Sequence, residues 1–333
     1  MSAINPATTA PARDVGIDLL RVAAIAAVVC GHLVLPEPLR NAIYGWHVPL
    51  FFFLSGWFYR PGRPPIQEVR GRWMSVGRPY VFWLVLIGAL EAVVSVVHGG
   101  MSLRWVGAHL WGGAFLVSPF SAFWFMSALI MAAVLYRVLA DGVSPHAALA
   151  LGLLACGAAR LAPEIVAKTP LAAGQALIAL VFVYAGHQVA SSPALRRGPV
   201  WGVPVAAVGI GLFAVGLVEP LDLKAASLGT PVLSVLTALA VCWGLTTAAR
   251  AVRSCGIRAD RAIVSLAATG TGVIYVHAVL IWGLHAVGHG EGPLLPTFCL
   301  VLAGSWSAAL LLARTPLRGW ALGRAPAPPP LSR

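Results

Sequence analysis

The chain has 333 residues, of which 59% are hydrophobic and only 10% are charged. A soluble protein of this length could not cover so much apolar surface, because folded soluble proteins need a polar exterior. The formal net charge is +12, but the basic residues are spread between apolar segments. That distribution argues against a nucleic-acid partner and for a protein embedded in a lipid bilayer.

The N-terminus begins with residues 1–14, which are rich in Ala, Thr and Pro and are predicted to be disordered. The first apolar stretch, residues 15–35, is too long for the core of a signal peptide and is followed by no good cleavage site. It also contains Arg21 and His32. We therefore expect a membrane helix here.

Apolar segments separated by charged or Pro- and Gly-rich breaks predict an all-α, polytopic membrane protein with about ten spans. The predicted spans are residues 16–35, 44–60, 79–98, 121–140, 145–161, 170–190, 199–218, 228–249, 262–285 and 293–313. Residues 104–117 are shorter and are interpreted as a re-entrant or interfacial piece. Together these segments define one membrane domain over residues 15–315, followed by a Pro-rich tail at 316–333.

The basic residues predict the orientation of this domain. With the N-terminus in the cytoplasm, most arginines fall on the inner side, which is the usual bias of membrane proteins. The outer side receives only Arg40, Arg104, Arg160, Lys168 and Lys224. Both termini are therefore expected in the cytoplasm, and the protein in the cytoplasmic membrane.

Metal and redox chemistry receive little support from the sequence. The five cysteines form no C-x-x-C pair and lie mostly in apolar segments, as small core residues do. His285 and His289 have a spacing suitable for zinc, with Glu291 close by, but no third ligand stands on a fixed element. No metal and no bound cofactor are predicted.

The first predicted helix carries Asp18, Arg21 and His32, although ionisable side chains inside a bilayer are costly and commonly functional. Arg21 and His32 share one stripe of the helix, roughly 16 Å apart. In the simpler alternative, Arg21 pairs with Asp18 and His32 bonds a neighbouring helix.

Several segments, in chain order, resemble one family. An arginine, ten residues and a histidine (Arg21 to His32) stand in the first helix, followed by HVPLFFFLSGWF at residues 47–58. A basic segment at 70–78 precedes Pro79 and Tyr80, FWFM stands at 123–126, and IYVH at 274–277. Together they resemble membrane acyltransferase family 3. Residues 47–58 are especially similar to its fucose 4-O-acetylase-like branch.

This resemblance implies an O-acyltransferase of the cytoplasmic membrane that modifies carbohydrates. The residue usage, rich in Ala, Gly, Pro and Arg, indicates a bacterial source. Such an enzyme takes an acyl group, expected to be acetyl, from acyl-CoA such as acetyl-CoA. It transfers the group to a hydroxyl of a sugar or glycoconjugate.

Helix depth adds an independent expectation. Counting 1.5 Å per residue from each helix midpoint places His32 and His47 at about the same depth in the outer half, with His277 nearby. The predicted catalytic residues are His32 as general base, Arg21 as holder of the donor or of developing charge, and Asp18, which orients Arg21. An acyl-histidine intermediate on His32 is the alternative.

Two further sets of residues complete the predicted site. Substrate binding is expected from His47, Ser55, Glu91, Trp124, Tyr275 and His277. For Ser55, a close helix contact together with Gly56 is favoured over a role as nucleophile, because a Ser-Gly pair in such a helix more often marks packing. The phosphates of acyl-CoA are expected to meet Arg60, Arg70, Arg72 and Arg78 on the inner side.

A different class of protein also fits the composition. Transporters or flippases for a lipid-linked sugar carry buried Arg and His as well. They commonly show repeats between their halves, and none is evident here. Consumption of acyl-CoA distinguishes the two, because a transporter does not use it.

Overall fold

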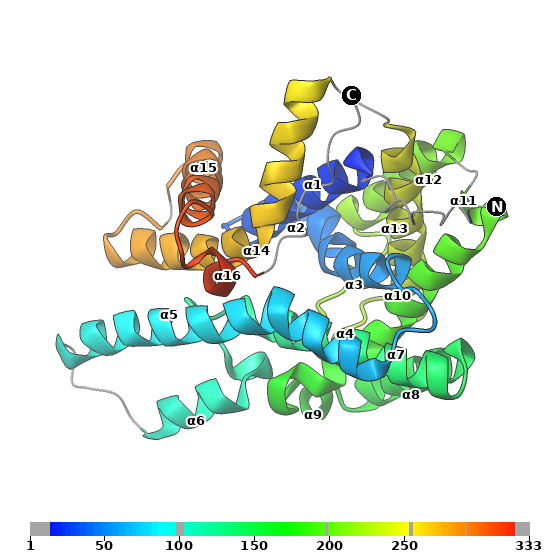
Figure 1. The fold of residues 1–333 in the computed structure, drawn as a ribbon, viewed down its shortest axis with the longest axis horizontal. Coiled ribbons are helices and arrows are strands. Elements are labelled where there is room, and N and C mark those ends of the chain that lie inside the picture. Colours follow the sequence, from blue (N-terminus) through cyan, green and yellow to red (C-terminus); the bar gives the residue numbers. More distant parts are fainter. Residues whose placement is uncertain (1–13, 98–102, 197–198, 253–255, 291, 324–333) are drawn as a thin grey trace, which may run out of the picture.

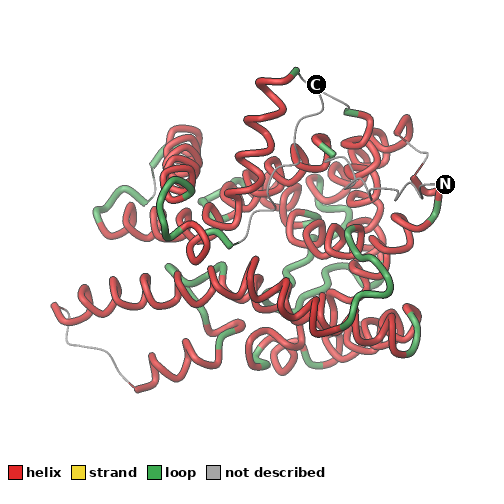
Figure 2. The backbone as a smooth tube through the Cα atoms, viewed as in Figure 1, coloured by secondary structure: helices red, strands yellow, loops and turns green. Residues whose placement is uncertain are grey.

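The computed structural model describes residues 14–97, 103–196, 199–252, 256–290 and 292–323. Of the described residues, 79% are helical. Within them, helices joined by loops account for the whole fold, with no strand (Figure 2). The predicted all-α fold class is confirmed. The predicted disorder of residues 1–14 falls almost wholly on residues outside the described ones.

The helices follow one another along the chain, and a longer connection, residues 215–232, joins α12 to α13 (Figure 1). They are α1 (Val15–Gly31), α2 (Glu37–Tyr44), α3 (His47–Trp57), α4 (Pro65–Arg72), α5 (Arg78–Val97), α6 (Leu103–Trp111), α7 (Phe123–Gly142), α8 (Pro145–Leu161), α9 (Pro163–Ala167), α10 (Ala173–Ser191), α11 (Pro193–Arg196), α12 (Pro199–Ala214), α13 (Leu233–Ala251), α14 (Ile257–Ala286), α15 (Leu294–Leu312) and α16 (Arg318–Ala321).

Local chemistry marks the helix starts. Asp14 Oδ1 accepts a hydrogen bond from the backbone N–H of Ile17 and caps α1, and Ser144 caps α8 in the same way. Proline stands in the first turn of α2, α4, α8 and α9. There its missing N–H costs no hydrogen bond.

Each of the ten predicted spans contains a helix: α1, α3, α5, α7, α8, α10, α12, α13, α14 and α15. Among the described residues, six helices are long and apolar enough to cross a membrane by themselves, namely α5 (with α4 leading into it), α7, α10, α13, α14 and α15. The helical segments are thus confirmed, while the count of about ten spans and the cytoplasmic termini stay predictions.

Several predicted boundaries are wrong. The span expected at 44–60 begins only at His47, because Gly45 packs against the ring of Phe213 and separates α2 from α3. The span expected from residue 228 begins at Leu233. Residues 318–321 form α16, and Trp83 Nε1 on α5 donates to the carbonyl of Ala321. Packed structure therefore continues past the expected start of the tail at residue 316.

The helices pack in pairs, chiefly α12 on α13, α10 on α3, α14 on α15 and α1 on α14. Gly56 and Gly186 allow α3 and α10 to approach closely, because a Cβ on either would lie 1.8 Å from a carbonyl oxygen of the facing helix. This confirms the close-packing interpretation for the Gly56 half of the Ser55-Gly56 pair. The contact holds α3 rigidly between the two polar regions described below.

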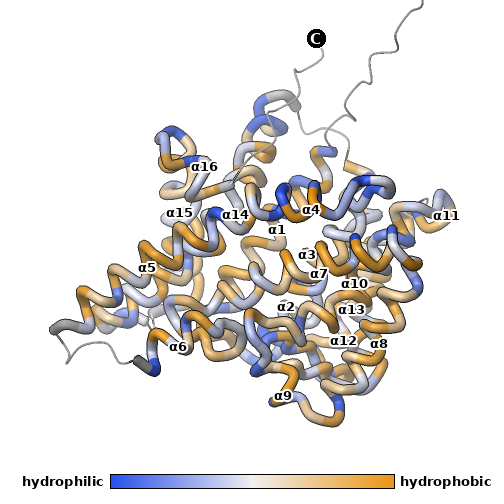
Figure 3. The backbone as a smooth tube through the Cα atoms, turned by 60° about the horizontal axis from the view of Figure 1, so that its bottom comes forward, coloured by the Kyte–Doolittle hydropathy of each residue, from blue (hydrophilic) through white to orange (hydrophobic). Residues whose placement is uncertain are grey.

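Large apolar side chains remain exposed on the outward faces of α5, α8, α12 and α15. Examples are Val85, Val93, Leu154, Val208 and Leu300. Hydrophobic residues run along α5 and α8, whereas hydrophilic residues gather at α4 (Figure 3). Apolar surface on this scale is stable against lipid and not against water. The chain is a membrane protein.

The basic ends of several helices lie together. Arg250 at the end of α13 pairs with Asp14 at the start of α1 at 3.8 Å and lies over the ring of Trp57 at the end of α3. Arg250 also donates to the carbonyl of Arg196 in α11. These contacts, with Arg60 directly after the end of α3, define one end of the bundle, which we call the arginine end.

Candidate active site

Three histidines from distant parts of the chain meet at the opposite end of α3. His32 directly follows α1, His47 is the first residue of α3, and His277 lies within α14. The rings of His32 and His277 contact edge to face, with centroids 4.8 Å apart. His47 contacts the ring of Tyr44 at 5.2 Å, and Tyr44 donates to the carbonyl of Gly31 at 3.1 Å. The expectation from helix depth that these histidines cluster is confirmed.

The backbone sets the tautomer of all three rings. Nδ1 of His32 lies 2.8 Å from the carbonyl oxygen of Val28, Nδ1 of His47 lies 2.8 Å from that of Ile43, and Nδ1 of His277 lies 3.0 Å from that of Val273. A carbonyl oxygen only accepts, so each neutral ring carries its proton on Nδ1. Each Nε2 then presents a basic lone pair. Nε2 of His277 is buried and has no hydrogen-bond partner.

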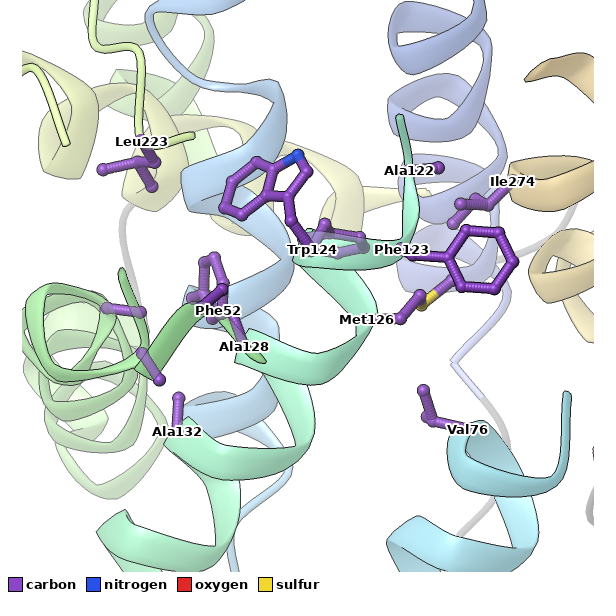
Figure 4. Packing of buried hydrophobic residues seen from close by; sticks show 14 of the residues in the cluster. Phe52, Val76, Ala122, Phe123, Trp124, Met126, Ala128, Ala132, Leu223 and Ile274 are labelled. Atoms are coloured by element: carbon purple, nitrogen blue, oxygen red, sulfur yellow. The ribbon is translucent and has the colours of Figure 1, made fainter. Parts of the chain in front are cut away.

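A cavity of about 220 Å³ opens beside these rings. Its lining combines histidines with aromatic, aliphatic and charged side chains: Val28, His32, Tyr44, His47, Val48, Ser121, Ala122, Trp124, Phe125, Leu221, Asp222, Leu223, Lys224 and Ile274. Figure 4 shows Ala122 and Trp124 at the start of α7 in the same part of the core as Leu223 and Ile274. A few polar groups converging in an apolar pocket are typical of a small-molecule site.

Residues that the sequence analysis did not single out form one wall of this cavity. Asp222 and Lys224 belong to the segment between α12 and α13, and Tyr44 ends α2. Lys224 Nζ donates to the carbonyl of Leu116 at 2.6 Å. Burial lowers the pKa of the Lys224 amino group, and the nearby Asp222 carboxylate opposes that shift. The sequence signal is the polar step from Asp222 to Lys224 between two apolar spans, of which the sequence analysis used only Lys224, as an outer-side charge.

The structure separates two of the predicted catalytic residues, Arg21 and His32. Arg21 does not line the cavity of His32. Its Nη1 donates to Asp18 Oδ1 at 3.3 Å, as the simpler alternative proposed, and the Arg21 side chain is 39% exposed. Arg21 lies on α1 and His32 directly follows it, as expected, but only His32 lines the cavity.

The predicted substrate-binding residues divide in the same way. His47 and Trp124 line the cavity and His277 contacts His32, whereas Ser55, Glu91 and Tyr275 lie elsewhere. The ring of Tyr275 is fully buried between those of Trp83 and Phe123. Glu91 is on α5, where one carboxylate oxygen is buried without a hydrogen-bond partner.

The predicted phosphate-binding arginines lie at the arginine end. Arg60 and Arg70 are exposed, and Arg78 lies over the ring of Trp320 at 5.1 Å. Arg72 is already engaged, because it donates to Glu68 at 2.8 Å and to Ser55 Oγ at 2.9 Å.

A buried arginine that the sequence analysis treated as an inner-side charge organises this end. Arg137 on α7 has a side chain only 2% exposed and forms ion pairs with Glu68 at 3.3 Å and Asp141 at 3.0 Å. Asp141 also accepts a hydrogen bond from Tyr59. Nearby, Tyr136 and His187 share a hydrogen bond of 2.6 Å. We call these residues the arginine network.

A metal centre finds no support among the described residues, where His, Cys, Asp and Glu form no group able to hold an ion. Glu291, one member of the spacing noted near His285, lies outside the described part of the chain. Cys30, Cys156, Cys242 and Cys299 are free thiols.

An all-helical membrane bundle with imidazoles beside a mixed polar and apolar cavity suits a membrane-embedded enzyme. The family model described as an acyltransferase domain, that of acyltransferase family 3, matches residues 14–314. The chain therefore belongs to acyltransferase family 3 and is a membrane acyltransferase of the O-acetyltransferase-like kind. No curated protein and no solved structure matches it. Family membership removes the basis of the transporter alternative.

Proposed function

We propose that this protein transfers an acyl group, acetyl in the simplest case, from acyl-CoA to a hydroxyl of a sugar or glycoconjugate in the cytoplasmic membrane. The observation that carries the proposal is the position and tautomer of His32. Its Nδ1 proton is held by the carbonyl of Val28, and its ring lies in the wall of the cavity. This is the arrangement that a general base for a neutral hydroxyl requires.

The proposed reaction uses the unprotonated ring nitrogen of His32, Nε2. Nε2 of His32 takes the proton of the acceptor hydroxyl as the oxygen attacks the carbonyl carbon of the thioester. The tetrahedral intermediate then collapses, its carbon–sulfur bond breaks, and the leaving thiolate takes the proton from His32 as free CoA. His277 packs against the His32 ring and limits its movement.

The donor is proposed to enter from the arginine end. Arg60 and Arg70 expose guanidinium groups there, and arginine binds phosphate well. Arg21 lies roughly 16 Å along α1 from His32. That separation favours a role in holding the donor over a role at the reacting carbonyl. Asp18 orients Arg21 through their ion pair.

The acceptor is proposed to be a sugar for two reasons. Residues 47–58 resemble the fucose 4-O-acetylase-like branch of the family. The cavity also offers the flat ring of Trp124 together with polar side chains. Apolar faces and hydroxyls alternate on a sugar ring, so this mixed lining suits it.

A covalent route uses the same lone pair. Nε2 of His32 would attack the thioester and carry the acyl group before the hydroxyl accepts it. Rapid quenching with radiolabelled acetyl-CoA in the absence of acceptor separates the two routes, because only the covalent one leaves label on the protein.

The deciding experiment measures release of free CoA thiol by purified protein given acetyl-CoA and a panel of methyl glycosides. Acceptor-dependent release that is lost in His32→Ala supports the proposal. His146→Ala is the matched control, because His146 is exposed and bonds only Tyr184 among the described contacts. Full turnover in His32→Ala would refute the proposed base.

A further inference from the structure

We propose that the segment between α12 and α13 forms the acceptor-binding wall of the cavity, where Lys224 and Asp222 bind hydroxyls of an uncharged sugar. We call residues 219–230 the acceptor hairpin. The inference rests on the proposed function. It deepens it by naming acceptor-binding residues and the charge class of the acceptor.

The acceptor hairpin is rigidly built. The backbones of Asp222 and Ser227 exchange two hydrogen bonds, of 3.0 and 2.9 Å. The base of the hairpin is closed by Thr230 Oγ1, which accepts from the N–H of Glu219 at 3.0 Å, and by Ser234, which donates to the carbonyl of Glu219. Gly229 has a φ of +61°, and a Cβ there would lie 2.3 Å from the Glu219 carbonyl oxygen. A segment so tied is a fixed part of the site.

The hairpin also enters the protein interior. Leu221, Leu223 and Ala226 are at most 3% exposed. Gln175 on α10, itself fully buried, donates through Nε2 to the backbone carbonyl of Lys224 at 3.0 Å. The backbone of Lys224 is therefore held from a membrane-spanning helix, and Lys224 lines the same cavity as His32.

Both charged side chains retain bonding capacity for a ligand. The Lys224 ammonium has three protons, and the carbonyl of Leu116 takes one of them at 2.6 Å. Asp222 is exposed at the cavity, and its Oδ1 accepts from the N–H of Ala225 at 3.2 Å. A carboxylate has about four acceptor sites. A donor and an acceptor two residues apart suit neighbouring hydroxyls, each of which donates and accepts.

The balance of charge indicates an uncharged acceptor. Lys224 and Asp222 carry opposite unit charges and are the lining residues charged at neutral pH, while the histidines and Tyr44 are the other titratable groups there. An anionic acceptor would gain from Lys224 but be repelled by Asp222, and a cationic one would meet the reverse. A neutral polyhydroxyl satisfies both.

The test compares Lys224→Met and Asp222→Asn with the wild-type protein, using acetyl-CoA and the more active of methyl glucoside and methyl galactoside. We expect KM for the glycoside to rise about tenfold or more in each variant, the scale of losing a hydrogen bond to a charged group. KM for acetyl-CoA should stay within about twofold. Lys224→Arg, which keeps a cation, should recover most of the glycoside affinity.

Charge selectivity gives a second readout with the uronic acid of the same glycoside. Asp222→Asn should shift the ratio of kcat/KM values toward the uronic acid by about fivefold, and Lys224→Met should shift it away by a similar factor. Lys168→Met is the matched control, because Lys168 is exposed, pairs with Glu164 and lies outside the cavity.

The outcomes are separable. Wild-type protein that releases no thiol with any acceptor defeats the proposed function. Wild-type turnover with unchanged glycoside KM in both hairpin variants overturns only this inference, as does an equal rise in Lys168→Met. If Lys224→Met fails to fold, Asp222→Asn and Lys224→Arg decide the matter through the uronic acid ratio.

Discussion

The two ends of α3 carry polar clusters that differ in how their hydrogen bonds are used. At the histidine end, Nε2 of His277 lacks a partner and Lys224 uses one of its three protons, beside a cavity. At the arginine end, Arg137 binds both Glu68 and Asp141 through its two terminal nitrogens, and only its Nε is buried without a partner. A buried polar atom left unbonded costs free energy. We infer that the first end keeps its bonding capacity for substrates, whereas the second uses it for stability.

The largest expected effect is on catalysis at the histidine end. His32→Gln should lower kcat by about 10² to 10⁴ because a general base is lost. Ser55→Ala, at the other end of the same helix, should keep kcat within about twofold, since Ser55 bonds Arg72 away from the cavity. Thiol release at saturating acetyl-CoA and glycoside measures both. Equal losses would erase the distinction between the ends.

The next effect is on stability at the arginine end. Arg137→Met removes the ion-pair partner of Asp141 and leaves Glu68 with Arg72 alone, and should cost about 3 to 5 kcal/mol of unfolding free energy. Reversible unfolding in detergent micelles measures this change. KM for the glycoside should not move. Lys168→Met, which breaks an exposed pair, should leave unfolding unchanged. A stable Arg137→Met protein with weakened acceptor binding would contradict the assignment.

A smaller effect separates the role of Arg21 on α1 from that of His32 at the end of α1. Arg21→Gln should raise KM for acetyl-CoA about tenfold, the loss expected for one charge-assisted hydrogen bond, and leave KM for the glycoside unchanged. Initial rates varied in each substrate test this. A fall in kcat with both KM values intact would instead bring Arg21 to the reacting carbonyl.

The smallest effect tests the edge of the arginine network. Tyr136→Phe removes the hydrogen bond to His187, and should cost about 1 kcal/mol of unfolding free energy with no change in turnover. Thermal unfolding and thiol release in the same preparation check it. Loss of turnover in the folded variant would make His187 part of the active machinery.

Much of the fold could be predicted because apolar runs of membrane length leave little choice. Backbone groups in lipid must bond within the segment, so such runs become helices. The residues at which the helices begin and end were less predictable. The span expected from residue 228 begins only at Leu233, because Gly229 and Thr230 close the hairpin at residues 219–230 instead.

The candidate site was predictable in part for a similar reason. Depth along a helix follows from residue count alone, and so His32, His47 and His277 could be expected to meet. The position of Lys224 and Asp222 beside these histidines could not be predicted, because residue count does not fix depth within a loop. Arg137 looked like one more inner charge, and only the packing of α7 against α4 buries it.

By itself, therefore, the sequence determined an all-helical membrane acyltransferase with an imidazole in its first helix, because hydrophobic length and local spacing are properties of the chain alone. The tertiary structure decided which polar groups share a cavity and which neutralise one another. Those partners come from segments far apart in the chain, and packing alone sets the contacts between them.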